Sequence, residues 1–135
     1  MWHKRIEQLP EVGSDVLFTI PSQNDNSIDV GWLDNGKDNG SHCFVGRAFG
    51  YDLSDVEKWR YIPSLDQFNK IDNNVTLSEP LLVYIPKLNK SDCAYRIGRF
   101  EQDPDTQEIF FESDNDDTTC CIEDVEKWIL LSSLI

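Results

Sequence analysis

The pentapeptide Asp-Val-Glu-Lys-Trp occurs twice in this 135-residue sequence, at residues 55–59 and again at residues 124–128. Two upstream segments of the first half have counterparts in the second half, in the same order and at an offset that drifts only from 65 to 69 residues. These segments are 16–21 with 81–86, and 28–33 with 95–100. Ordered matches at three places predict two copies of one unit, repeat 1 at residues 1–65 and repeat 2 at residues 66–135.

Each repeat is predicted to form three short strands followed by a short helix. The expected strands are 15–20, 28–33 and 43–49 in repeat 1, and 80–85, 95–100 and 108–112 in repeat 2. The first strand of each repeat ends at an Ile-Pro pair, because proline cannot donate a hydrogen bond to a neighbouring strand. The second strand alternates, which places Ile28, Val30 and Trp32 on one face. Gly31 and Gly98 within these strands predict a bulge or a close approach of two backbones.

The repeated Val-x-x-Trp motif predicts the helical turn that closes each repeat. A spacing of three residues places Val56 and Trp59 on one helical face, where the indole is expected to anchor a core. The equivalent residues of repeat 2 are Val125 and Trp128. Ser54 with Glu57 fits a capping box at the start of this turn. We therefore expect a β-rich α+β fold, in which two tandem β-β-β-(short helix) repeats form one pseudo-symmetric antiparallel-sheet domain. Whether the repeats share one continuous sheet or form two packed lobes is left open.

The chain is strongly acidic, which restricts its partners. Twelve Lys and Arg residues stand against 25 Asp and Glu residues, so the formal net charge is −13 and the pI is near 4.3. Direct binding to DNA, RNA or an anionic membrane requires a basic surface, and we expect none of these partners. The sequence contains neither the roughly 18 to 20 apolar residues of a membrane span nor a secretory signal, which predicts a cytoplasmic protein.

Few residues of this chain suit catalysis or metal binding. The four cysteines are Cys43, Cys93, Cys120 and Cys121. Their irregular spacing predicts free thiols, and a zinc site with His42 is disfavoured because structural zinc sites show close ligand pairs. His42 is poorly placed to activate Cys43, since neighbours on a strand point to opposite faces. Residues 34–40 suit an Asn-Gly hairpin turn better than a calcium loop, whose sixth position requires glycine. We expect no enzymatic activity, no metal and no cofactor.

Repeat 1 carries an ordered set of short motifs. They are an N-terminal Trp at Trp2, Leu-Pro-x-x-Gly-x-x-Val-Leu at residues 9–17, and Val-x-x-Trp-x-x-Ile-Pro at residues 56–63. This pattern, which covers residues 2–63, resembles a family of small proteins of unknown function found mostly in phage and prophage genomes. Repeat 2 lacks the Leu-Pro-x-x-Gly segment and the closing proline. The resemblance implies an origin in a mobile element and a β-rich fold, and it implies no catalytic residues.

The acidic residues are concentrated in repeat 2. Repeat 1 has a net charge of −4 and repeat 2 of −9, and residues 101–126 contain eleven acidic residues without a Lys or Arg. A solvated face that aids solubility would account for this pattern. The leading hypothesis is instead a phage-type accessory protein that docks its acidic face on a basic host protein, as an inhibitor of a nucleic-acid-handling defence or regulatory factor. The expected contact residues are Asp103, Asp105, Glu108, Glu112, Asp114, Asp116 and Asp117.

A small-molecule or nucleotide-binding protein is the alternative. Its pocket would lie at the repeat interface and combine aromatic side chains with arginines that bind phosphate. The candidate residues are Trp32, Trp59, Tyr61, Tyr84, Tyr95, Arg47, Arg60, Arg96 and Arg99. A small metal-dependent hydrolase is a third candidate, and the oligomeric state is left open.

Overall fold

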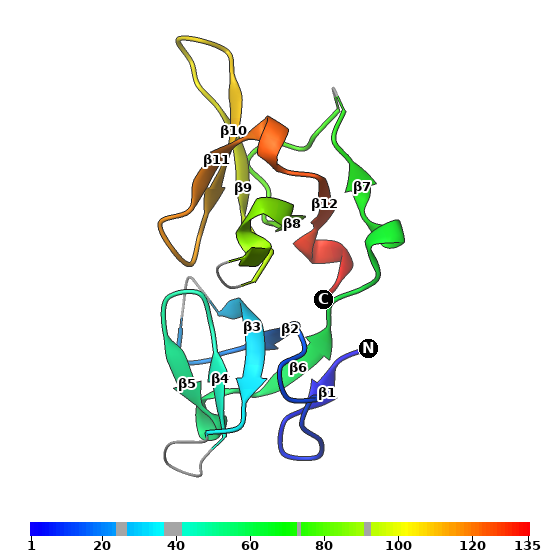
Figure 1. Cartoon of the computed structure of the whole chain (residues 1–135), viewed down its shortest axis with the longest axis vertical. Helices are drawn as coiled ribbons and strands as arrows, with labels where there is room; N and C mark the ends of the chain where they lie inside the picture. The colour runs from blue at the N-terminus through cyan, green and yellow to red at the C-terminus, as the bar shows by residue number, and fades with distance from the viewer. Residues whose placement is uncertain (24–26, 37–41, 73, 91–92) are drawn as a thin grey trace. The chain divides into compact units, whose positions relative to one another are not determined.

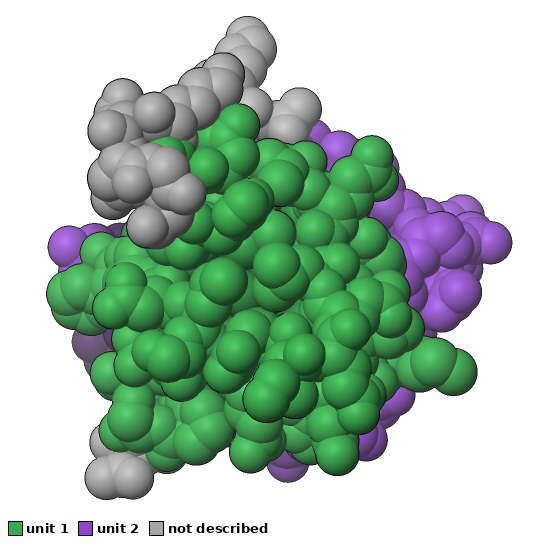
Figure 2. All heavy atoms as spheres, turned by 90° about the horizontal axis from the view of Figure 1, so that it is seen from below, with its two compact units in different colours: residues 1–62 green, residues 63–135 purple. Residues whose placement is uncertain are grey.

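The structure is a computed structural model in which the chain divides into two compact units, unit 1 at residues 1–62 and unit 2 at residues 63–135 (Figure 2). It describes residues 1–23, 27–36, 42–72, 74–90 and 93–135. The boundary between the units lies three residues before the predicted boundary between the repeats. Each unit has its own six-stranded sheet, so the described strands of the two repeats do not share one sheet. No helix in the described ranges has the length and apolar character that a membrane crossing requires.

The sheet of unit 1 is antiparallel (Figure 1). Its strands are β1 (His3–Lys4), β2 (Val16–Thr19), β3 (Ile28–Asp34), β4 (Cys43–Val45), β5 (Gly50–Asp52) and β6 (Lys58–Tyr61). Their spatial order is β1-β6-β2-β3-β4-β5, so the last strand of the unit lies beside the first long strand. A single 3-10 turn, η1 (Leu53–Asp55), precedes β6.

The sheet of unit 2 repeats this arrangement. Its strands are β7 (Asn69–Lys70), β8 (Leu81–Tyr84), β9 (Tyr95–Gln102), β10 (Ile109–Ser113), β11 (Thr119–Cys121) and β12 (Lys127–Leu130). Its 3-10 turns are η2 (Leu65–Gln67), η3 (Pro86–Lys90), η4 (Ile122–Asp124) and η5 (Leu131–Ser133). The spatial order, β7-β12-β8-β9-β10-β11, has the same connectivity as that of unit 1. The prediction of a β-rich antiparallel fold is therefore confirmed, and the architecture is consistent with two similar units.

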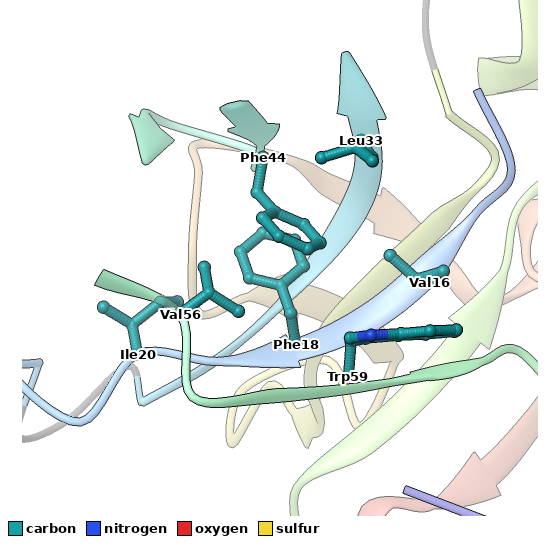
Figure 3. Close-up of a cluster of buried hydrophobic side chains, with 7 residues drawn as sticks. All are labelled: Val16, Phe18, Ile20, Leu33, Phe44, Val56 and Trp59. Atoms are coloured by element: carbon teal, nitrogen blue, oxygen red, sulfur yellow. The ribbon is translucent and has the colours of Figure 1, made fainter. Parts of the chain in front are cut away.

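The core of unit 1 lies on one face of its sheet (Figure 3). Its buried members are Val16, Phe18, Ile20, Leu33, Phe44, Val56 and Trp59. Phe18 packs on Phe44 with 5.0 Å between ring centroids, and the indole of Trp59 lies on the other side of Phe18 beside Val16 (Figure 3). The indole N–H of Trp59 donates to the carbonyl oxygen of Gln8 over 2.8 Å. The predicted role of Trp59 as a core anchor agrees with this packing.

The core of unit 2 draws on the same strand positions. Its buried members are Leu81, Val83, Ile85, Phe100, Phe111, Val125 and Trp128. Phe100 packs edge-on against Phe111 at 6.1 Å and against Trp128 at 6.4 Å between ring centroids. Where β2 supplies the aromatic Phe18, the equivalent residue of β8 is Val83, and β9 supplies the aromatic Phe100 instead. Each unit thus fills its core with a different arrangement of large and small side chains.

The predicted helix at the Val-x-x-Trp motif is wrong. Only one 3-10 turn forms, and Trp59 lies in β6. The N-cap residue of η1 is Asp52 and makes no side-chain capping bond, so the Ser54–Glu57 capping box is wrong too. The backbone N–H of Glu57 donates to the carbonyl oxygen of Thr19 over 3.0 Å, because pairing with β2 gives the chain a strand partner that a short isolated helix would lack.

The predicted third strand of repeat 1, residues 43–49, ends early. It stops at Val45, where the N–H of Gly46 donates to the carbonyl oxygen of Phe49 over 2.8 Å and closes a turn into β5. The sequence analysis did not predict the short edge strands β1, β5, β7 and β11. Strands of two or three residues leave too short an alternation to detect.

The two strand glycines mark close backbone approaches, as predicted. A Cβ atom built on Gly31 would overlap the carbonyl oxygen of Val45, and one built on Gly98 would overlap that of Glu112. Both obstacles are backbone atoms of the next strand, which cannot move without breaking a ladder. The face predicted to carry Ile28, Val30 and Trp32 is opposite to the core face, which takes Leu33 from β3.

We expect Gly98→Ala to destabilise the protein by about 2 kcal/mol or more, because the added methyl group must displace backbone of β10. Gly50→Ala is the matched control, since the nearest atom to its Cβ is the carbonyl oxygen of Phe44 at 3.8 Å. That control should change stability by no more than about 0.5 kcal/mol. Urea unfolding of the two variants measures both effects. Equal unfolding midpoints would contradict the close approach.

Candidate functional site

The acidic segment of unit 2 begins in the hairpin that joins β9 to β10. The strands pair from Gly98 opposite Ser113 to Gln102 opposite Ile109. Asp103 forms the turn, because its side-chain oxygen accepts the N–H of Asp105 over 2.8 Å and its backbone carbonyl accepts the N–H of residue 107 over 2.9 Å. Asp105 and Glu108 are exposed at this turn. Asp103 therefore shapes the turn that presents the two exposed acids.

Asp116 belongs to a buried ion pair. One of its carboxylate oxygens lies 2.9 Å from Nε of Arg96, and Arg96 is only 5% exposed. The guanidinium also donates to the carbonyl oxygens of Cys93 and Tyr95, over 2.7 and 2.8 Å. Burial alone would raise the pKa of Asp116, but hydrogen bonds from Ser113 and Thr118 and the Arg96 charge hold it below its usual value. Asp116 is therefore engaged within the unit.

Asp114 contacts a second arginine more loosely. Its carboxylate lies 3.7 Å from Nε of Arg99, which also donates to the carbonyl oxygen of Ser78 over 3.0 Å. Partial burial raises the pKa of Asp114; Arg99 opposes this rise, while the carboxylates of Glu112 and Glu101 add to it. Glu112 and Glu101 therefore lie close enough to Asp114 to disfavour its charged form.

Most other acids of residues 101–126 have no cation of their own. Lys87 pairs with Asp124 at 2.6 Å. No ion pair joins the remaining acids to another described residue. These acids are Glu101, Asp103, Asp105, Glu108, Glu112, Asp117, Glu123 and Glu126. The predicted contact set thus separates into Asp114 and Asp116, which face arginines of the same unit, and acids that keep their charge uncompensated.

A pocket lined by both apolar and acidic side chains lies among these carboxylates. It has a volume of about 230 Å³ and is formed by the ends of β10 and β11 with η4. Ile109, Phe110 and Ile122 supply its apolar lining, beside Cys121. The carboxylates on it are Asp103, Glu108 and Glu123. We name these three acids together with Asp105 the acidic surface. Glu123 and the apolar lining could not be predicted from the sequence, because the β10–β11 pairing is what brings η4 to the hairpin.

The unit 1 residues of the small-molecule alternative are engaged in internal contacts. The Arg47 guanidinium lies 5.2 Å from the ring centroid of Trp32, and its Nε donates to the carbonyl oxygen of Val30. Trp59 is fully buried. The hydroxyl of Tyr61 accepts the N–H of Glu11 over 2.9 Å. Nε of Arg60 donates to the Tyr61 carbonyl oxygen over 3.2 Å.

The unit 2 residues of that alternative are engaged as well. Tyr84 packs on Tyr95 with 5.4 Å between ring centroids. Arg96 and Arg99 face Asp116 and Asp114, as described above. None of the nine residues of this alternative lines the pocket at β10, β11 and η4.

His42 and Cys43 are the residues that the sequence offered for catalysis or metal binding in unit 1. His42 is exposed, and Cys43 begins β4. Burial, followed by the charges of Asp34 and Asp52, raises the pKa of the Cys43 thiol, which disfavours the reactive thiolate. The proposed turn at 34–40 lies partly outside the described residues. Within the described ranges no group of three or more His, Cys, Asp or Glu residues is arranged to hold a metal ion.

Comparisons with known proteins find no family model, no curated protein and no solved structure that matches this chain. The resemblance of residues 2–63 to a phage and prophage family therefore stays a prediction.

We expect Asp116→Asn to lower the free energy of unfolding at pH 7 by about 2 kcal/mol, because the buried Arg96 loses its counter-charge. Asp117→Asn is the matched control and should change it by less than about 0.5 kcal/mol. Asp114→Asn should not destabilise, since folding already disfavours the Asp114 charge. Chemical unfolding of the three variants measures this order, and a larger loss in Asp117→Asn would contradict it.

The effect of Asp116→Asn should depend on pH. Its pKa is lower in the folded chain than in the unfolded chain, where it is about 4. The stabilisation is therefore fully present above pH 4 and is lost as the pH falls through the folded-state value. Unfolding curves of wild type and Asp116→Asn should converge between pH 7 and about pH 2. A difference that grows on acidification would contradict the assigned direction.

Proposed function

We propose that this chain is a non-enzymatic binding protein that docks the acidic surface of unit 2 on a basic protein. The observation that carries the proposal is the placement of Asp103, Glu108 and Glu123 in one pocket beside the apolar side chains of Ile109, Phe110 and Ile122. No described cation of the chain pairs with these carboxylates. An arginine or lysine of a partner would relieve their mutual repulsion, and an adjoining apolar side chain would fill the pocket.

The charge distribution supports association with a positive partner. The long-range field of a chain with net charge −13 attracts basic proteins and repels nucleic acid. Steering by such a field accelerates encounter, and the pocket supplies the specificity that charge alone does not give.

The partner that fits this surface best is a protein whose basic groove ordinarily holds nucleic acid. Exposed carboxylates on a hairpin present negative charge to such a groove, as phosphates do. The protein would then act as an inhibitor that competes with nucleic acid, in the manner of a phage-type accessory protein within the host cytoplasm. This proposal requires neither a cofactor nor a metal.

The small-molecule alternative receives no comparable support. Its arginines donate to carbonyl oxygens or face carboxylates of the chain, and the indole N–H of Trp59 is hydrogen bonded to Gln8. These groups would have to give up internal bonds before they could hold a phosphate.

Charge reversal at the hairpin tests the proposal. We expect Asp105→Lys/Glu108→Lys to lower the amount of basic protein captured from a bacterial lysate at least tenfold, as measured by quantitative mass spectrometry. Glu11→Lys/Glu79→Lys changes the net charge equally at exposed residues outside the acidic surface, and it should retain capture. Wild-type capture should fall between about 0.05 M and about 0.5 M salt, because exposed charges are screened.

A captured protein must then pass a second measurement. Once purified, it should release labelled double-stranded DNA when the wild-type chain is added, and it should keep the DNA when Asp105→Lys/Glu108→Lys is added. Equal capture by wild type and Asp105→Lys/Glu108→Lys, or capture that does not depend on salt, would rule out the acidic surface as the docking site.

A further inference from the structure

Unit 1 carries a cleft of the opposite charge. It lies where β1 meets β6, has a volume of about 410 Å³, and is lined by Lys4, Arg5, Ile6, Glu57 and Lys58. Ile6 is 79% exposed, although the transfer of an isoleucine side chain out of water is favourable in free energy. This basic cleft stands out in a chain whose overall charge is −13. The exposed isoleucine and the cations together mark it as an interaction surface.

The two lysines of the basic cleft face each other across the strand pair. Lys4 is in register with Lys58, one residue along from His3 and Trp59. The His3 ring packs on the indole at 4.6 Å, so the lysines point to the opposite face of the sheet. Like charges directly opposite each other destabilise a strand pair. Glu57 lines the same cleft, but no ion pair joins Lys4 or Lys58 to it or to another described residue.

The equivalent lysine pair of unit 2 is treated differently. Lys70 is in register with Lys127, but the ammonium group of Lys127 donates to the carbonyl oxygen of Leu65 over 3.0 Å. One of the two lysine ammonium groups is therefore hydrogen bonded to a backbone carbonyl oxygen. The ammonium group of Lys58 in the basic cleft has no acceptor among the described residues. The cleft also contains the exposed Ile6 and Arg5, whose Nε donates to the carbonyl oxygen of Val56 over 3.1 Å. An anionic partner with an apolar hollow would satisfy both features.

We propose that the occupant of the basic cleft is the acidic surface of a second copy of this chain. Ile6 of one copy enters the pocket formed by Ile109, Phe110 and Ile122 of the other. Lys4 and Lys58 then lie against the carboxylates of that pocket. The two surfaces are different patches, so the contact is head-to-tail and extends to chains or rings of molecules. This inference rests on the acidic surface being a docking site, as proposed above.

A second copy fits the cleft better than other polyanions. The net charge of −13 repels nucleic acid, anionic lipid and a second copy alike at long range, so the choice among them rests on the local surfaces. Nucleic-acid phosphate offers no apolar hollow for Ile6. The second copy meets both requirements, since its pocket has carboxylates beside an apolar lining.

Sedimentation equilibrium of the full chain tests the inference. We expect the weight-average mass to rise with protein concentration at about 0.05 M salt and to return to 15.6 kDa at about 0.5 M salt. Lys4→Glu/Lys58→Glu should remain monomeric at low salt, and so should Glu108→Lys/Glu123→Lys. Lys70→Glu, at the equivalent position of unit 2, and Glu79→Lys are the controls that should still associate.

Mixing the two monomeric variants gives the decisive result. Lys4→Glu/Lys58→Glu keeps its acidic surface, and Glu108→Lys/Glu123→Lys keeps its basic cleft. An equimolar mixture should therefore form a dimer of one copy of each and nothing larger. Circular dichroism confirms that each variant is folded, and Lys4→Glu alone should raise the melting temperature because it replaces a repulsive pair by an attractive one.

Three results would overturn the inference. They are a wild-type chain that stays monomeric at low salt, association that survives Lys4→Glu/Lys58→Glu, and binding of heparin or phosphatidylserine vesicles that depends on the basic cleft while self-association does not. Capture of basic proteins is measured separately from self-association, because Lys4→Glu/Lys58→Glu should still capture them from the lysate. A wild-type chain that captures basic proteins but does not self-associate would contradict this inference and leave the proposed function standing.

Discussion

The burial of one indole in the closing strand holds the other parts of each unit together. Trp59 lies in β6, between β1 and β2, and it packs on His3 while its N–H reaches the carbonyl oxygen of Gln8. A single side chain thus fixes the start of the unit, its first long strand and its end. The repeated pentapeptide supplies the same residue to β12. There the indole N–H of Trp128 is buried without a hydrogen-bond partner among the described residues, at a cost of about 1 to 3 kcal/mol.

A second pair of equivalent positions holds a buried charged residue in each unit, and the sign of the charge differs between the two units. In β3, Asp29 is 2% exposed and accepts the backbone N–H groups of Val30 and Arg47. The equivalent residue of β9 is Arg96, which is held by Asp116 from the turn after β10. In each unit the turn that follows β4 or β10 supplies one partner of the buried charge, the N–H of Arg47 for Asp29 and the carboxylate of Asp116 for Arg96. This is why Asp116 serves the fold of unit 2, and why the charge available to a partner lies on the β9–β10 hairpin.

The sequence predicted features that depend on local chemistry and missed those that depend on pairing. Ile-Pro ended the first strands and Gly31 and Gly98 marked close approaches, because proline and glycine act through their own backbone. The Val-x-x-Trp spacing suggested a helix, but β2 offered Trp59 a strand partner that no local pattern reveals. The acidic residues could not be sorted for the same reason. Asp116 and Asp117 are adjacent and chemically identical, and only the fold brings Arg96 to one of them.

A basic cleft on unit 1 and an acidic surface on unit 2 make the proposed activity of the chain depend on its own concentration. The cleft and a basic partner compete for the same carboxylates, so a partner must bind more tightly than Lys4 and Lys58 of another copy do. Self-association then covers the apolar side chains of the pocket and the exposed Ile6 while no partner is present, which limits nonspecific contacts of both surfaces. A strong basic partner shifts the equilibrium toward single chains by mass action alone. No conformational change within either unit is needed.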